Sequence, residues 1–90
     1  MASELRPTEA YARNRGRLSP ALAKLVAEAE GEIALDPGHR HWRRVVDGVV
    51  YDYSVADHGL LIVYRELAGD VIELVDLLDL HGGRSRRAGG

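Results

Sequence analysis

The second half of the chain contains three apolar segments separated by short polar turns, a pattern typical of consecutive β-strands. The segments are Val49–Ala56, Leu60–Leu67 and Val71–Leu80, and the turns are residues 57–59 and 68–70. Along the first segment the apolar and polar side chains divide between two faces. Because three-residue connections suit hairpins, we expect these strands to pair antiparallel in chain order.

The last of these segments also fits a helix. As a strand it places four apolar residues on one face: Ile72, Leu74, Leu78 and Leu80. Its acidic residues, however, recur every three positions, as they do on the polar face of a helix, and Asp70 and Glu73 have the spacing of a capping box. The tight turn and the β-branched residues at the start of the segment favour the strand.

The first third of the chain predicts two helices. Thr8 is a candidate N-cap for a short helix over Glu9–Arg15. Ser19, followed by Pro20, is the N-cap of a second helix in which apolar residues recur at helical spacing. The sequence Asp-Pro-Gly at positions 36–38 ends this helix.

Length and composition predict one small domain over residues 1–90. Of its 90 residues 46% are hydrophobic, which suffices for a modest, aliphatic core. Met1–Pro7 is a poor strand sequence, and residues 1–7 and 87–90 are expected to be flexible. The predicted fold class is α+β, with an N-terminal helical pair packed on a three- or four-stranded antiparallel sheet.

The composition disfavours several classes of protein. The chain contains no cysteine, which excludes a disulfide framework and thiolate zinc sites. Residues 1–10 lack the basic region and apolar core of a signal peptide, and no apolar run approaches the ~20 residues of a membrane span. We therefore expect a cytoplasmic protein without a membrane partner.

Charge is segregated along the chain, although its net value is only -2. Residues 45–80 contain eight acidic residues and one basic residue, Arg65, whereas residues 39–44 contain three Arg and two His. A general nucleic-acid binder is usually basic overall, so only local patches suit phosphate here. Arg also suits bidentate contacts to carboxylates.

The first basic patch is residues 39–44, in which two His and three Arg surround Trp42. His41, Arg43 and Arg44 are candidate phosphate or RNA ligands, and the indole is able to stack on a base. The alternative is a solvated loop leading into a strand, with Trp42 capping the core.

The second basic patch is His81 with the Arg residues at 84, 86 and 87. A histidine beside cations has a lowered pKa and remains neutral, so it is suited to act as a general acid or base. The alternative is a polar strand end followed by a basic tail. Spacings such as HxxxH and HExxH do not occur, and we expect neither a metal nor another cofactor.

From about Leu18 to Arg87, the order of these elements and motifs resembles the RelE/ParE superfamily of bacterial type II toxins. Residues 25–37 are similar to the family's second helix, and residues 41–51 to its linker, in which a basic residue precedes a Gly and a tyrosine-bearing strand. Residues 59–65 resemble its central strand, and residues 80–84 its closing L-H-G-R-R. The resemblance favours a strand for Val71–Leu80.

The resemblance implies a toxin that binds a cognate antitoxin, and we expect an exposed apolar groove for an antitoxin helix or strand. RelE-type members bind and cleave messenger RNA in the ribosome with Lys and Arg on the sheet face. The matching strand here has Asp52 and Ser54 instead. The family also usually opens with a strand at the sheet edge, which Met1–Pro7 does not predict.

As a ribonuclease, the protein would promote metal-independent attack of the ribose 2′-hydroxyl on the adjacent phosphate. His81 would be the catalytic acid or base, Arg43, Arg44 and Arg84 would clamp phosphates, and Arg65 is a nearby candidate. One alternative is a non-enzymatic ParE-like toxin that inhibits a protein such as DNA gyrase. Another is a degenerate member that binds only its antitoxin.

Overall fold

The computed structural model describes residues 2–38 and 40–80. Along the chain, its two helices and five strands are β1 (Glu4–Pro7), α1 (Glu9–Gly16), α2 (Pro20–Leu35), β2 (Trp42–Val46), β3 (Val49–Ala56), β4 (Leu60–Leu67) and β5 (Val71–Asp79). A short 3₁₀ turn at Asp57–Gly59 connects β3 to β4.

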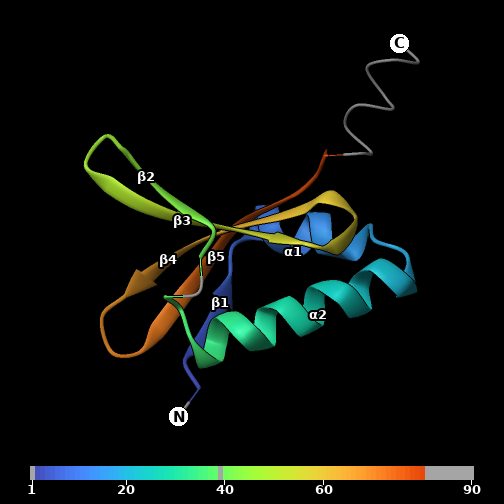
Figure 1. The fold of residues 1–90 in the computed structure, drawn as a ribbon, viewed down its shortest axis with the longest axis horizontal. Coiled ribbons are helices and arrows are strands. Elements are labelled where there is room, and N and C mark those ends of the chain that lie inside the picture. The colour runs from blue at the N-terminus through green and yellow to red at the C-terminus, as the bar shows by residue number, and fades with distance from the viewer. Residues whose placement is uncertain (1, 39, 81–90) are drawn as a thin grey trace.

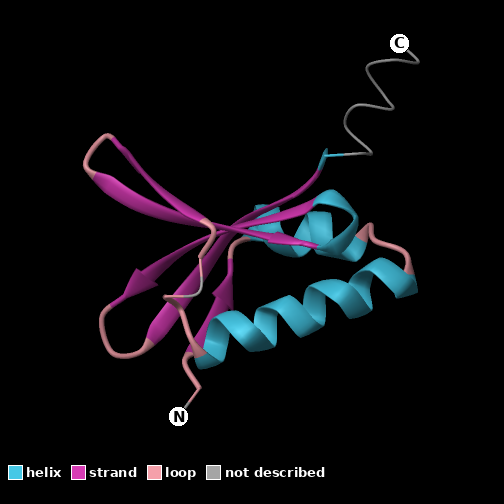
Figure 2. Cartoon of the chain, viewed as in Figure 1, coloured by secondary structure: helices cyan, strands magenta, loops and turns pink. Residues whose placement is uncertain are grey.

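The five strands form one sheet in the order β1-β5-β4-β3-β2. β1 is parallel to β5, and the other neighbours are antiparallel. Both helices lie on one side of this sheet (Figures 1 and 2). The prediction of an α+β fold with a helical pair on a sheet is confirmed. The sheet differs from the predicted one in having five strands and one parallel pair.

The strand interpretation of the last apolar segment is confirmed, because β5 runs from Val71 to Asp79. β3 and β4 have the predicted bounds and pair antiparallel as expected. The helix caps also agree with the sequence. The hydroxyl of Thr8 accepts a hydrogen bond from the Tyr11 amide (3.1 Å), and that of Ser19 accepts one from the Leu22 amide (3.3 Å).

β1 forms where the sequence predicted a poor strand. Its pairing comes from distant segments, since the Glu4 amide donates to the carbonyl of Asp70 (2.9 Å) and the Thr8 amide to that of Leu74 (3.0 Å). Leu5 packs against the core. The Ser3 amide also donates to the carbonyl of Ala34 at the end of α2 (2.8 Å). Tertiary contacts therefore supply the β1 pairing that local propensity does not predict.

β2 is the second strand that the sequence did not predict as such. A two-residue turn, Asp47-Gly48, joins it to β3, with Val46 opposite Val49. Both turn residues have positive φ, 51° for Asp47 and 79° for Gly48, as a type I′ hairpin turn requires. The basic patch of residues 40–44 therefore lies beside and on an outer strand rather than in a loop.

The core lies between the helices and one face of the sheet, which we call the helix-side face. Its buried members are Tyr11, Val26, Ile33, Leu60, Ile62, Tyr64, Ile72, Leu74 and Leu77. The Tyr11 hydroxyl donates to Glu30 (2.6 Å), which also binds Arg15 (2.8 Å) and thereby ties α1 to α2. Since strand side chains alternate, Trp42, Arg44, Tyr53 and Arg65 lie on the opposite face, which we call the open face.

A bulge in β5 changes which leucines reach the core. Val63 lies opposite Asp76 while Tyr64 lies opposite Leu74, so β5 carries one extra residue, Val75. Contacts from α1 satisfy the irregular backbone, because Thr8 donates to the Val75 carbonyl (2.7 Å) and Asn14 to the Leu77 carbonyl (3.0 Å).

Beyond the bulge the alternation is reversed. Leu77 is buried, whereas Leu78 and Leu80 are 39% and 41% exposed. The predicted core positions at Leu78 and Leu80 are therefore wrong, since strict alternation takes no account of an inserted residue.

Candidate functional site

The β2–β3 hairpin projects from the sheet and, together with His41 just before it, accounts for three of the four predicted binding residues that the structure describes. β3 pairs with β4 only over Asp52–Ala56, so Val49–Tyr51 extend beyond this pairing. Figure 1 shows this hairpin diverging from the β4–β5 hairpin. A small cavity of ≈ 240 Å³ lies between the two hairpins and is lined by Arg43, Val50, Asp52 and Glu66.

Arg43 forms ion pairs with two carboxylates, those of Asp52 and Glu66, between the two hairpins. Its Nε donates to Oδ1 of Asp52 (2.7 Å) and its Nη2 to Oδ2 (3.3 Å), while Nη2 also lies 3.5 Å from Glu66. The hydrogen bond to Asp52 raises the pKa of Arg43. Asp52 is only 1% exposed, so its charge requires such partners. The predicted phosphate clamp at Arg43 is therefore already occupied by Asp52.

Arg40 is a second cation at this cluster; it belongs to the predicted basic patch but was not one of the individual phosphate ligands predicted from the sequence. Its Nε lies 3.4 Å from Oδ1 of Asp52. Asp52 is therefore a shared counter-ion for two arginines at the base of the hairpin. In the sequence, the signal for this pairing was an acidic residue, Asp52, within a predicted strand.

Arg65 and Arg44 lie on the open face but differ in their partners. Arg65 donates to Glu73 on β5 (2.7 Å), and this hydrogen bond raises its pKa. Arg44 lies opposite Tyr51, and within residues 2–38 and 40–80 it forms no ion pair. Of the predicted arginines that the structure describes, Arg44 is thus the one available to an external anion.

An aromatic pair stands beside Arg44 on the open face. The rings of Trp42 and Tyr53 stack with centroids 5.2 Å apart and an interplanar angle of 5°. Trp42 is 42% exposed, so it does not cap the core as the alternative interpretation proposed. His41 is exposed, and its Nδ1 accepts a hydrogen bond from the Val55 amide (3.1 Å), which fixes the imidazole against β3.

His81 and Arg84, the predicted catalytic residue and one of the phosphate ligands, lie outside the described residues. The described residues that precede them end at Leu80, just after β5. The structure therefore brings together His41, Arg43 and Arg44 on or beside β2, and it places Arg65 two strands away on β4.

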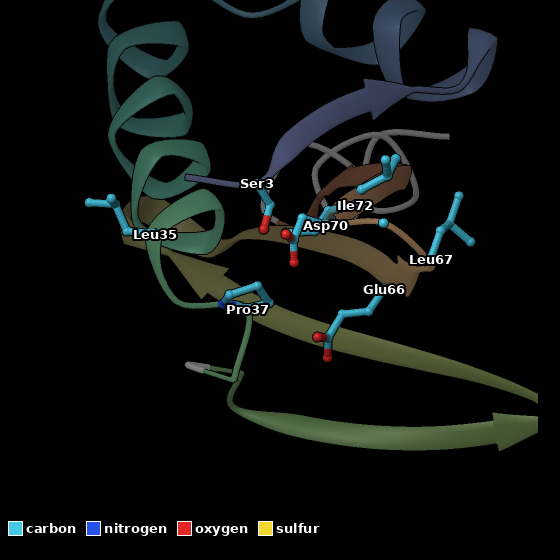
Figure 3. A pocket seen from close by; sticks show the side chains of 9 residues that line it. Ser3, Leu35, Pro37, Glu66, Leu67, Asp70 and Ile72 are labelled. Carbon is cyan, nitrogen blue, oxygen red and sulfur yellow. The ribbon is translucent and has the colours of Figure 1, made fainter. Parts of the chain in front are cut away.

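A larger cavity of ≈ 390 Å³ lies between the end of α2 and the β4–β5 turn. Figure 3 shows Ser3, Leu35, Glu66 and Asp70 around it, with the Ser3 hydroxyl and both carboxylates on its rim. Carboxylates repel phosphate, and α2 contributes no basic residue in its last turn. This cavity is therefore unsuited to nucleic acid.

The described surface is thus better equipped for binding than for phosphoryl chemistry. Of the three predicted arginines that the structure describes, Arg43 and Arg65 are neutralised by carboxylates, and Arg44 adjoins stacked aromatic rings. No group of three His, Asp or Glu side chains in the described ranges is placed to hold a metal ion. No helix among the described residues has the length and apolar character needed to span a membrane.

Comparison of the chain with protein-family models, with curated proteins and with solved structures finds no match.

Proposed function

We propose that this protein is the toxin component of a cytoplasmic bacterial type II toxin–antitoxin pair, of the RelE/ParE kind. On this proposal it binds a cognate antitoxin and acts by inhibiting a protein target such as DNA gyrase, rather than by cleaving RNA. We prefer the non-enzymatic alternative because Arg43 and Arg65, two of the candidate phosphate ligands, are paired with carboxylates.

The element order supports a RelE/ParE-like protein. The helical pair lies on one face of a sheet whose last three strands, β3, β4 and β5, are consecutive and antiparallel. β1 joins the sheet at its edge, which is the opening strand that the resemblance implies. These features agree with the family pattern.

The ion pair between Arg43 and buried Asp52 is the observation that carries the choice of a protein target. A metal-independent ribonuclease stabilises a developing phosphoryl charge with positioned cations. Here the Arg43 guanidinium already donates two hydrogen bonds to Asp52, and Arg65 donates to Glu73. A phosphate bound at Arg43 or Arg65 would share the guanidinium with a carboxylate that is 2.7 Å from its Nε and that would repel the phosphate.

Induced expression in a bacterial host tests this proposal. We expect growth arrest with filamentation and DNA damage, while full-length messenger RNA remains intact. Cleaved messenger RNA would contradict the protein-target mechanism. Normal growth at a verified level of folded protein would contradict toxicity altogether and favour a degenerate member.

Antitoxin binding has its own test, because any ligand of the native state raises the melting temperature. Thermal unfolding should shift upward when the product of the neighbouring gene is added at excess. An unchanged midpoint would contradict binding of that protein.

The second candidate function is the metal-independent messenger RNA endoribonuclease, and the stacked pair Trp42–Tyr53 beside Arg44 favours it. An exposed aromatic ring next to a guanidinium is a common platform for an unstacked base. If the purified protein cleaves RNA, His81→Gln should lower turnover about 10²–10⁴-fold, the usual contribution of a positioned acid or base. Unchanged cleavage in this variant would exclude His81 from the mechanism.

A further inference from the structure

The two outer strands of the sheet differ in their ability to accept another strand. β1 has four residues and ends in Pro7, which has no amide proton to donate. The Ser3 amide beside it is already bonded to the end of α2. β2 has five residues without Pro or Gly, all exposed, and no described strand lies beyond it. Of these two edges, β2 is the one suited to pair with an added strand.

The geometry of the hairpin sets which backbone groups of β2 face outward. Bonded and non-bonded pairs alternate in an antiparallel hairpin, and the pair beside a two-residue turn, Val46–Val49, is a bonded one. The backbone N–H and C=O groups of Arg43 and Val45 therefore point to the outer edge. An added strand would find donors and acceptors at alternate positions.

The side chains along this edge combine exposed apolar surface with Arg44, which forms no ion pair with any residue that the structure describes. Arg44 lies at the centre of β2 on the open face, between Trp42 and Val46, each 42% exposed. Val45, on the helix-side face, is 65% exposed. A neighbouring strand that carries a carboxylate opposite Arg44 and β-branched residues around it would match this surface.

Charge also argues against a second copy of this chain as the occupant. An antiparallel pairing that uses all five residues of β2 is centred on Arg44 and places this guanidinium opposite its own copy. Like charges directly opposite one another destabilise a sheet. An acidic strand reverses the sign of that interaction.

We propose that the outer edge of β2 binds an extended acidic segment of another protein as a sixth strand, with a carboxylate of that segment paired to Arg44. The proposal deepens the proposed function, on which it rests for the existence of a protein partner. Main-chain hydrogen bonds supply the affinity of such strand addition, and the alternating side chains supply its specificity.

A peptide titration of the full chain tests the proposal. The probe is the synthetic peptide TVEVEVT, and TVKVKVT is its matched control. In ¹⁵N-labelled protein we expect saturable shifts and slowed hydrogen exchange at the amides of Arg43–Val46 with the acidic peptide only. Shifts confined to other residues, or equal binding of both peptides, would overturn the proposal.

Variants separate charge from backbone pairing. Arg44→Glu should weaken the acidic peptide by roughly tenfold and make TVKVKVT the preferred ligand, because the cross-strand charge pair is inverted. Val45→Pro should abolish binding by removing an outward N–H, provided that the amide spectrum shows β3 intact. Arg6→Ala, at the exposed β1 edge, is the matched control and should leave binding unchanged.

The outcomes distinguish this proposal from the proposed function. Peptide binding at β2 by a protein that is not toxic on expression retains the edge site and contradicts the toxin function. Toxicity with no saturable binding at β2 retains the toxin function and contradicts the edge site. Concentration-dependent dimerisation that shifts the same β2 amides in the absence of peptide would overturn the acidic partner in favour of a second copy.

Discussion

Strand β4 lies at the centre of the sheet and has Leu60–Tyr64 buried, whereas β2, two strands away, leaves all five of its side chains exposed. β4 has a strand on each side and the helices over one face. β2 is held by one neighbour, by a tight turn at Asp47-Gly48 and by the ion pairs of Asp52.

The comparison separates the residues that stabilise the fold from those that are available to a partner. Burial of apolar area is the main source of stability, and β4 provides it on both faces. β2 contributes little burial and keeps Arg44 and its outer backbone edge accessible. Substitutions in the two strands should therefore have opposite effects on stability and on binding.

The largest expected effect is in the central strand. Ile62 is fully buried in the core, so Ile62→Ala should lower the free energy of unfolding by about 2–5 kcal/mol. Val45→Ala in β2 is the matched control and should change it by no more than about 0.5 kcal/mol. Urea unfolding of both variants measures the difference. Similar losses of stability in the two variants would contradict the conclusion that β4 stabilises the fold more than β2 does.

The next effect concerns the base of the hairpin. Asp52→Asn keeps the shape of the side chain but removes the charge that Arg43 and Arg40 share. We expect a lower melting temperature and faster amide exchange in β2, because two cations lose their buried counter-ion. Glu66→Gln is the control, since Glu66 is an exposed partner of Arg43 at 3.5 Å and should matter little. An unchanged exchange rate in Asp52→Asn would show that the ion pair does not hold the hairpin.

A third prediction uses pH to probe the boundary between β4 and the hairpin. Burial, followed by the nearby charge of Asp52, raises the pKa of Tyr64 to about 12. The unfolded tyrosine releases its proton near pH 10, so between about pH 10 and 12 the unfolded state binds fewer protons than the native state. Stability that is fully present below pH 10 should therefore be lost as pH rises to 12.

Tyr64→Phe isolates this contribution from other alkaline effects. The variant also loses the hydrogen bond from the Tyr64 hydroxyl to the Pro37 carbonyl (2.9 Å), so it should start about 1 kcal/mol less stable at pH 8. Its stability should then fall less steeply above pH 10 than that of the native chain. Equal slopes, measured by urea unfolding at each pH, would contradict the assignment to Tyr64. Tyr11 remains ionisable in both proteins, and its pKa is also raised by burial.

The smallest expected effect is at the hairpin turn. Gly48 has a φ of 79°, which an L side chain adopts at a cost of about 1 kcal/mol. Gly48→Ala should speed amide exchange at Val46 and Val49 while barely changing the global melting temperature, because β2 adds little to the core. Gly31→Ala in α2 is the counterpart, since nothing lies within 4 Å of the added methyl group, and should raise stability by about 0.5–1 kcal/mol. A large global loss from Gly48→Ala would place the hairpin in the cooperative core.

Local patterns in the sequence predicted most of the regular elements. The bounds of β3 and β4, the caps at Thr8 and Ser19 and the end of α2 near Leu35 follow from neighbouring residues. Such features depend on alternation, side-chain hydrogen bonds to adjacent amides and helix-stopping residues, and these interactions are present in the sequence itself. The acidic period of β5 was ambiguous for the same reason, because both a helix and a strand satisfied it locally.

The candidate site could be predicted only in part. The sequence identified Arg43, Arg44 and Arg65 as cations, yet it could not identify the carboxylates opposite Arg43 and Arg65. Cross-strand partners such as Asp52 and Glu73 depend on the register, and the register depends on which hairpins form. The missed strand β2 left Arg43 without an assigned partner.

By itself the sequence determined the α+β composition of elements, the helix ends and the antiparallel run of β3, β4 and β5. Only the tertiary structure decided that β1 joins β5 in parallel, that β2 forms the outer strand, and that a bulge at Val75 turns Leu77 inward. The physical reason is that β1 and the bulge obtain their hydrogen bonds from residues distant in the sequence, whereas β2 depends on the register of the hairpin that it forms with β3. The register of this hairpin sets Arg43 opposite Asp52 and Arg44 opposite Tyr51, so the charge available to a partner is a property of the folded sheet.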